Sequence, residues 1–313
     1  MLNPKNRGRL SLFTAQYINK SVDNHIMDSS TNIDLNVQAS ANSVVFPKRD
    51  PSYMARQDIL DGLKAWRIWF MLAYQDIKLR YRRSVLGPFW ITLSMAITVY
   101  TMGFLYAHLL HTNMQEYYPF LAAGMLSWSL ISTVITDLTE TFITSDNLLK
   151  QIKLPYSLYI HRVASRNVLI FFHNLAVMIP ILIIFHESAK VNFYTLLLIP
   201  NMFLVYINTV TYGMILSMIG ARYRDVSQII KSLIQVAFFV TPVMWNPVVL
   251  PAQYQSIMLL NPFYIFVELI RAPLIGSANS WSVMGIALLL TLIGILISYK
   301  MFARYRARII YWI

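Results

Sequence analysis

The stretch IKLRYRRSVLGPFWITLSMAITVYTMGFLYAHLL, from Ile77 to Leu110, decides the fold class of this chain. Basic residues crowd its beginning, and the rest is an apolar run without aspartate, glutamate, lysine or arginine. An α-helix needs roughly 20 apolar residues to cross a hydrocarbon core of about 30 Å, and this run is long enough. Basic flanks are retained on the cytoplasmic side, so the stretch predicts a membrane-spanning helix that begins inside.

The same arrangement recurs along the chain, because basic residues occupy every second gap between apolar runs. The alternate gaps hold only Lys190 and Arg271. The other gaps contain fifteen basic residues: Lys78, Arg80, Arg82, Arg83, Lys150, Lys153, Arg162, Arg166, Arg222, Arg224, Lys231, Lys300, Arg304, Arg306 and Arg308. This asymmetry predicts a multi-pass inner-membrane protein with both termini in the cytoplasm.

Six apolar runs have the length of a membrane span. We place them at residues 86–110, 118–137, 159–185, 195–219, 229–247 and 281–302. Residues 254–274 are also apolar, but a seventh crossing there would put the basic C-terminus outside. The pattern therefore predicts a re-entrant or interfacial helical segment at the outer surface, between spans five and six. Glu268 and Arg271, three residues apart on one helix, would neutralise each other there.

The composition excludes several classes of protein. The chain has 57% hydrophobic and 13% charged residues, whereas a soluble domain carries about 25% charged residues. Its net charge of +12 lies mostly at the ends of spans, which favours anionic lipid headgroups over nucleic acid as the partner. Cysteine is absent, and His108 and His111 have no further ligand nearby, so we expect no metal site and no catalytic residue.

Three regions follow from these patterns. Residues 1–57 are polar and rich in Asn and Ser, which predicts a disordered cytoplasmic extension. Residues 58–84 carry apolar side chains at spacings of three and four, which predicts an amphipathic helix at the membrane interface or against a soluble partner. Residues 85–313 form the transmembrane domain. The predicted fold is therefore all-α: a polytopic membrane protein with six transmembrane helices, an interface helix and an outer re-entrant segment.

The string LRYRRSVLGPFW, from Leu79 to Trp90, resembles the start of the first span in permease subunits of ABC exporters for O-antigen and related surface polysaccharides. The resemblance continues, in that family's order, through KLPYSLYIHRVASR, ARYRDV, FFVTPVMW and LLNPFYIFVELIRAPL. It covers residues 58–313, and the first string together with ARYRDV is fairly specific. The family's members usually begin near the amphipathic helix, so residues 1–57 depart from the pattern.

The resemblance implies the membrane subunit of an exporter in the bacterial inner membrane. Its substrate would be a lipid-linked polysaccharide, and its partners would be a second copy of itself and a separate ATP-binding subunit. The chain has no G-x-x-x-x-G-K-[ST] sequence, so ATP and Mg would be held by that partner and no cofactor by this chain. Two alternatives stay open: a permease for teichoic acid, a drug or a small lipid, and a membrane-embedded transferase acting on a lipid-linked glycan.

Two groups of residues on the cytoplasmic side carry the predicted coupling to the ATPase. Residues 138–156 suggest a short amphipathic helix that ends near a proline, and the resemblance implies that it docks on the ATPase through Asp146, Lys150, Lys153 and Pro155. A glycine and a proline after a basic cluster suggest an elbow that turns the interface helix into the first span, formed by Arg80, Arg82, Arg83, Gly87 and Pro88.

Three further groups are candidates for contact with the substrate. Arg222, Arg224 and Asp225 form a solvated loop on the plain interpretation, or bind a lipid diphosphate or the ATPase on the functional one. Sugar rings stack on aromatic side chains, which makes eight residues candidates for lining a glycan channel: Tyr100, Phe104, Trp128, Phe171, Phe172, Phe238, Phe239 and Trp245. The predicted outer gate comprises Asn261, Pro262, Phe263, Tyr264, Glu268 and Arg271.

Overall fold

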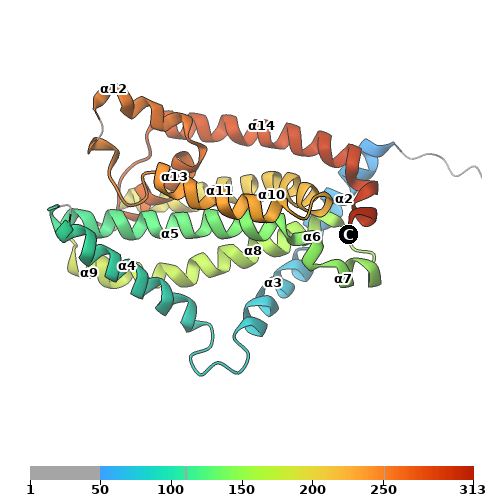
Figure 1. Ribbon diagram of the computed structural model, residues 1–313, viewed down its shortest axis with the longest axis horizontal. Coiled ribbons are helices and arrows are strands. Elements are labelled where there is room, and N and C mark those ends of the chain that lie inside the picture. The colour runs from blue at the N-terminus through green and yellow to red at the C-terminus, as the bar shows by residue number, and fades with distance from the viewer. Residues whose placement is uncertain (1–49, 110, 250) are drawn as a thin grey trace, which may run out of the picture. The chain divides into compact units, whose positions relative to one another are not determined.

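The computed structural model describes residues 50–109, 111–249 and 251–313. The described chain is helical, without a β-strand in these ranges, as the sequence predicts (Figure 1). The predicted extension lies mostly outside the described residues, since only residues 50–57 of it belong to the described part.

The predicted interface helix is two helices, and the first of them begins earlier than the sequence pattern suggested. Helix α2 (Pro51–Lys64) begins with proline, and the side chain of Asp50 accepts a hydrogen bond from Ser52 N at 3.1 Å. Ala65 separates it from the next helix, α3 (Trp66–Arg80). The two helices pack differently, which explains the break: α2 packs against both α8 and α14, whereas α3 packs along α8.

Five helical segments are long and apolar enough to cross a membrane: Phe89–Leu109, Met114–Thr139, Tyr156–Ile184, Phe193–Arg222 and Trp281–Trp312. They correspond to the first, second, third, fourth and sixth predicted spans. The third combines α8 (Tyr156–Asn174), η2 (Leu175–Val177) and α9 (Met178–Ile184), and the fourth combines η3 (Phe193–Leu197) and α10 (Leu198–Arg222). The first two are α4 (Phe89–Leu109) and α5 (Met114–Thr139), and the last contains α14 (Trp281–Tyr305), η6 (Arg306–Arg308) and α15 (Ile309–Trp312).

The fifth predicted span, 229–247, was placed wrongly at its end. Helix α11 (Val226–Val240) has 15 residues, which corresponds to about 22 Å and is shorter than the hydrocarbon core of about 30 Å. It ends at Thr241 because the residue before a proline, here Pro242, is disfavoured in helical conformation. Pro242 indicates this helix end in the sequence. The predicted span was extended past it because the residues that follow are also apolar.

The region between α11 and α14 contains short helices followed by one longer helix. Their bounds are Pro247–Val249 for η4, Ala252–Gln255 for α12, Ser256–Leu260 for η5 and Pro262–Leu274 for α13. Asn261 starts α13, because its side-chain oxygen accepts hydrogen bonds from the backbone N–H groups of Phe263 and Tyr264. Pro262 occupies the first helical position, where the missing N–H costs nothing.

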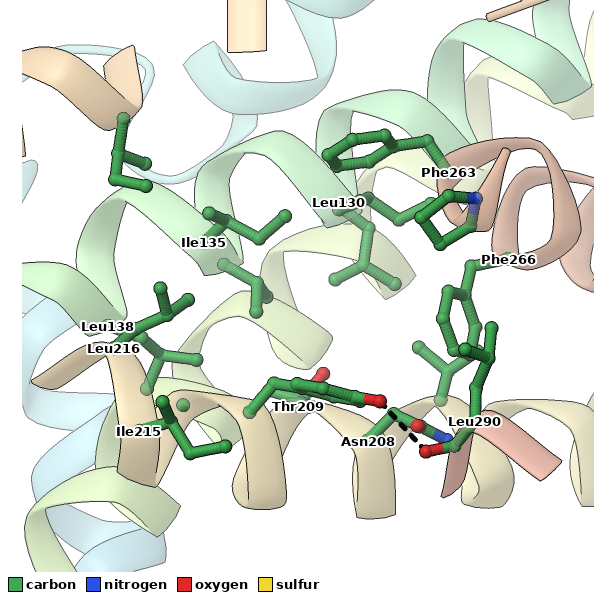
Figure 2. A pocket seen from close by; sticks show the side chains of 17 residues that line it. Leu130, Ile135, Leu138, Asn208, Thr209, Ile215, Leu216, Phe263, Phe266 and Leu290 are labelled. Carbon is green, nitrogen blue, oxygen red and sulfur yellow. Dashed lines mark hydrogen bonds between the residues drawn. The ribbon is translucent and has the colours of Figure 1, made fainter. Parts of the chain in front are cut away.

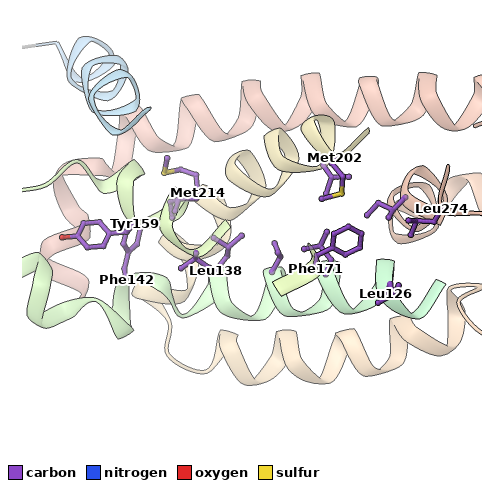
Figure 3. Packing of buried hydrophobic residues seen from close by; sticks show 14 of the residues in the cluster. Leu126, Leu138, Phe142, Tyr159, Phe171, Met202, Met214 and Leu274 are labelled. Carbon is purple, nitrogen blue, oxygen red and sulfur yellow. The ribbon is translucent and has the colours of Figure 1, made fainter. Parts of the chain in front are cut away.

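Helix α5 is the centre of the bundle and packs against α4, α8, α9, α10, α11 and α13. The main apolar core runs along it and contains Leu126 and Leu138 of α5, Tyr159 and Phe171 of α8, and Met214 of α10 (Figure 3). Figure 1 shows α2, α6, α7 and the C-terminus at one end of this bundle and α12 at the opposite end. The short helices α6 (Thr141–Thr144) and α7 (Asp146–Gln151) connect α5 to α8.

Close approach between α10 and the end of α5 depends on Gly220. A Cβ atom added at Gly220 would lie 2.0 Å from the carbonyl oxygen of Thr139, whereas one added at Gly285 in α14 would meet nothing within 4 Å. We expect Gly220→Ala to lower the free energy of unfolding by about 1–3 kcal/mol, because a backbone carbonyl cannot move aside cheaply. Gly285→Ala is the matched control and should be neutral or stabilising, since alanine is the better helix former. Apparent midpoints of thermal unfolding in detergent compare the two, and equal midpoints would contradict the expectation.

Candidate functional site

The connecting helices α6 and α7 lie at the same end of the bundle as α2 and the C-terminus, and we call it the basic end (Figure 1). It includes Lys150, Lys153, Arg222, Arg224 and Arg306, which come from segments far apart in the sequence. Among these segments, α6 and α7 occupy the place where the sequence predicted one short amphipathic helix. Phe142 of α6 and Leu149 of α7 are buried and fasten the segment to the bundle.

The predicted coupling residues lie on the outer side of this segment. Asp146 and Lys150 form an ion pair at 2.8 Å, one helical turn apart, and Lys150 is exposed. Lys153 is exposed too, in the connection after α7. Pro155 does not end α7, which stops at Gln151, but precedes α8 as its N-cap residue. Asp146, Lys150 and Lys153 therefore offer a charged surface to a partner.

Asp58 anchors the basic end, a role that the sequence pattern did not indicate. Its side chain is fully buried, and it accepts hydrogen bonds from Tyr156 N at 3.2 Å, Ser157 N at 3.0 Å and Arg306 Nε at 2.8 Å. The carboxylate thus caps the start of α8 and binds η6 near the C-terminus. The only sequence feature that indicated burial of Asp58 was its position on the same face of α2 as the small residues Ala55 and Gly62.

The predicted elbow is a tight connection between α3 and α4. Arg83 has a φ of 70° and Gly87 a φ of 55°, so the backbone enters the left-handed region twice. Val85 at its tip is fully exposed. In the described part of the chain, no ion pair involves Arg80, Arg82 or Arg83, so the elbow presents uncompensated positive charge next to an apolar tip. Such a combination suits the boundary between headgroups and hydrocarbon.

The loop before α11 is exposed, as the plain interpretation of its sequence predicted. The Arg222 guanidinium lies 5.1 Å from the ring centroid of Tyr223 and 5.6 Å from that of Trp312, which holds it toward the C-terminus. Arg224 and Asp225 are exposed. Their contact with a lipid diphosphate or an ATPase stays a prediction.

The eight aromatic candidates do not gather around one path within this chain. Phe104, Phe172 and Phe239 are exposed on the outside of the bundle, and Phe171 is buried in the main core. Trp128 packs against Phe238, with ring centroids 5.5 Å apart. The remaining two, Tyr100 and Trp245, are half-buried. The Tyr100 hydroxyl donates to Val177 O at 3.0 Å, and the Trp245 indole donates to Phe239 O at 3.4 Å.

The predicted outer gate contains a buried ion pair. Arg271 Nε donates to Glu268 Oε2 at 3.0 Å, which confirms the predicted pairing within one helix. Arg271 is only 1% exposed, because α13 packs against α5, α10 and α14. Its guanidinium also donates to Pro242 O at 2.7 Å and lies 4.1 Å from the ring centroid of Phe120. An ionisable pair inside an apolar bundle is a functional candidate.

This ion pair secures the turn that follows α11. Arg271 binds the carbonyl of Pro242, and the hydroxyl of Tyr117 donates to Met244 O at 2.9 Å. Gly124 makes room for the turn, because a Cβ atom there would lie 2.6 Å from Val243 O. Irregular backbone at membrane depth requires such internal partners, since lipid offers no hydrogen bonds. The turn is therefore held by α5 and α13 together.

A cavity of 410 Å³ lies between α5, α10, α11 and α13. Figure 2 shows Leu130, Ile135 and Leu138 lining it opposite Thr209 and Ile215, with the rings of Phe263 and Phe266 near one end. Its polar side chains are Asn208, Thr209 and Tyr212, and the Tyr212 hydroxyl already donates to Leu290 O at 2.8 Å. This lining suits hydrocarbon better than a polar glycan.

The fold, with five helices long and apolar enough to cross a membrane, is that of a polytopic α-helical membrane protein. A family model described as "ABC-2 type transporter" matches residues 67–275, and the chain belongs to this family. The resemblance that the sequence motifs indicated is thereby confirmed.

Curated relatives point in the same direction. Two of them are O-antigen export system permease proteins RfbA of Klebsiella pneumoniae, and they are 20% identical over 243 residues and 22% identical over 245 residues. Each alignment covers 75% of this chain and 92% of the relative. The protein of the same name from Myxococcus xanthus is 25% identical over 175 residues, which cover 56% of this chain and 66% of the relative.

Proposed function

We propose that this chain is the membrane subunit of an ATP-driven exporter that moves a lipid-linked polysaccharide, O-antigen or a similar glycan, from the cytoplasm across the inner membrane. The observation that carries the proposal is membership of the ABC-2 type transporter family together with relatives named as O-antigen export permeases. The basic end would face the cytoplasm, with both termini there. Helix α11 and the turn after it would complete six crossings, which keep the basic residues after α14 on the same side.

A separate ATP-binding subunit would bind ATP and Mg and dock on α6 and α7. Its closure would push on these two helices and on α3, and the elbow would carry the movement into α4. Two copies of the chain would form the pathway. The cavity between α5, α10, α11 and α13 is apolar, and the aromatic candidates are divided between the outside and the inside of the bundle, which supports a polar path between two copies rather than through one. The segment from η4 to α13 would control exit at the outer side.

Deletion of the chain in its native host tests the proposed export. We expect lipid-linked glycan to accumulate inside and to disappear from the outer face, as measured by surface labelling of intact cells. The chain purified without cross-linking should bring a stoichiometric ATPase with it. Normal arrival of the glycan at the outer face in the deletion strain, with a chain that purifies alone, would refute the proposal.

The docking assignment makes a separate prediction about α7. Reversing the charges at Asp146, Lys150 and Lys153 together should weaken ATPase association at least tenfold without preventing membrane insertion, because Lys150 and Lys153 are exposed and the half-buried Asp146 forms its ion pair with Lys150. Co-purification in detergent measures the association. Reversal of Arg308, which is exposed at the same end, is the control and should change it little. Unchanged association of the triple variant would place the docking surface elsewhere.

A further inference from the structure

We infer that Asp76, Arg162, Arg166, Asp137 and Asn167 form an ionic link that makes α3, α8 and the junction of α5 with α6 move as one body. On the proposed function, these are positioning residues: they would carry the movement of the docking segment α6–α7 to the elbow, and none of them needs to touch the glycan.

The first half of the link joins α3 to α8. Arg162 donates through Nε to Asp76 Oδ2 at 2.8 Å and through Nη2 to Asp76 Oδ1 at 2.6 Å. Two parallel hydrogen bonds between a guanidinium and a carboxylate fix orientation as well as distance. Around this pair, α3 packs on α8 through Ala73 and Ile77, and Trp69 stacks on His161 with ring centroids 5.4 Å apart.

The second half joins the same carboxylate to α5. Arg166, one turn after Arg162, lies between two acids: Nη1 is 3.4 Å from Asp76 Oδ2, and Nη2 is 2.7 Å from Asp137 Oδ2. Asn167 donates to that oxygen of Asp137 at 2.9 Å. One planar guanidinium therefore bridges α3 and α5, a role that the single ammonium of lysine cannot fill in the same geometry.

Asp137 also lies where α5 passes into the docking segment. Its carbonyl accepts hydrogen bonds from Glu140 N at 3.2 Å and from Thr141 Oγ1 at 3.0 Å, so it is held to the first residues of α6. Displacement of α6 would move Asp137, and Arg166 would transmit that displacement to Asp76. Asp76 lies just before the last turn of α3, and the elbow that leads into α4 follows this turn.

Helix stability does not explain where the two acids are placed. Asp137 lies in the last turn of α5 and Asp76 just before the last turn of α3, and the negative end of a helix dipole disfavours a carboxylate near these C-termini. The two arginines offset this cost, and two acids with two bases leave the cluster neutral. Its side chains are only 14% to 28% exposed, so solvent screens them little.

Conservative substitutions in the reconstituted complex with its ATPase test the link. Asp76→Asn, Asp137→Asn and the double variant keep side-chain shape and remove the ion pairs. We expect ATPase association and basal ATP hydrolysis to stay within twofold of wild type, while glycan moved per ATP hydrolysed falls about tenfold. The links act in series, so the double variant should lose no more than the worse single variant. Arg166→Lys should show the same loss although the charge is retained, and Asp61→Asn at an exposed position of α2 is the control.

A distance measurement reports on the link without ATP hydrolysis. The chain contains no cysteine, so cysteines introduced at exposed Tyr74 of α3 and exposed Gln151 of α7 can carry spin labels directly. Asp76→Asn and Asp137→Asn should broaden the distribution of label distances relative to wild type. A distribution as narrow as wild type, unchanged transport per ATP, or additive losses in the double variant would each overturn the link. A wild-type chain that moves no glycan would instead refute the proposed function, and the label distances would still decide whether the link exists.

Discussion

Replacement of Arg271 by methionine is expected to lower the free energy of unfolding by about 3–5 kcal/mol, because removing one partner of a buried ion pair leaves the other charge unpaired. The Glu268 carboxylate would lose its cation, and the carbonyl of Pro242 would lose its donor. The apparent midpoint of thermal unfolding in detergent measures the loss. The turn after α11 would also lose a side-chain donor, so we expect faster proteolysis between α11 and α13.

Two further variants decide whether burial causes this effect. Replacing Glu268 and Arg271 together by methionine should cost less than Arg271→Met alone, since no unpaired charge remains in the bundle. Arg308→Met removes the same charge at an exposed position and should change stability by less than about 0.5 kcal/mol. If Arg271→Met unfolded at the wild-type midpoint, the ion pair would have no role in holding α13.

Replacement of Asp58 by leucine is the second change with a large expected effect, again about 3–5 kcal/mol. The carboxylate is fully buried, and leucine would orphan three donors at once: the backbone N–H groups of Tyr156 and Ser157 and the Nε of Arg306. We expect lower thermal stability and faster proteolytic cleavage at the basic residues after α14, because Arg306 no longer binds α2.

Asp61→Leu is the matched control for this variant. Asp61 lies three residues further along the same helix and is exposed, so the change should alter stability by less than about 0.5 kcal/mol. Asp58→Asn retains one of the two acceptor oxygens and should fall between the two leucine variants. Equal unfolding of the Asp58→Leu and Asp61→Leu proteins would show that Asp58 does not anchor the basic end.

The sequence predicted the helical class, the places of five spanning segments and a short helical segment before Pro155, because these features repeat locally. Apolar length and basic flanks are properties of neighbouring residues, and so is the pairing of Glu268 with Arg271 one turn apart. The pair Thr241 and Pro242 also predicts the end of α11. The predicted span continued past it because the following residues are apolar.

What the sequence by itself determined is therefore a bundle of apolar helices with its basic residues in alternate connections. Only the tertiary structure decided which charges meet: Asp58 with Arg306, Asp76 with Arg162, and Asp137 with Arg166. Each of these pairs joins different helices, and nothing in the periodicity of one helix says which neighbour its charged residue will face. Arg271 shows the same limit, because its spacing revealed its partner, whereas its burial followed from how α13 packs against α5.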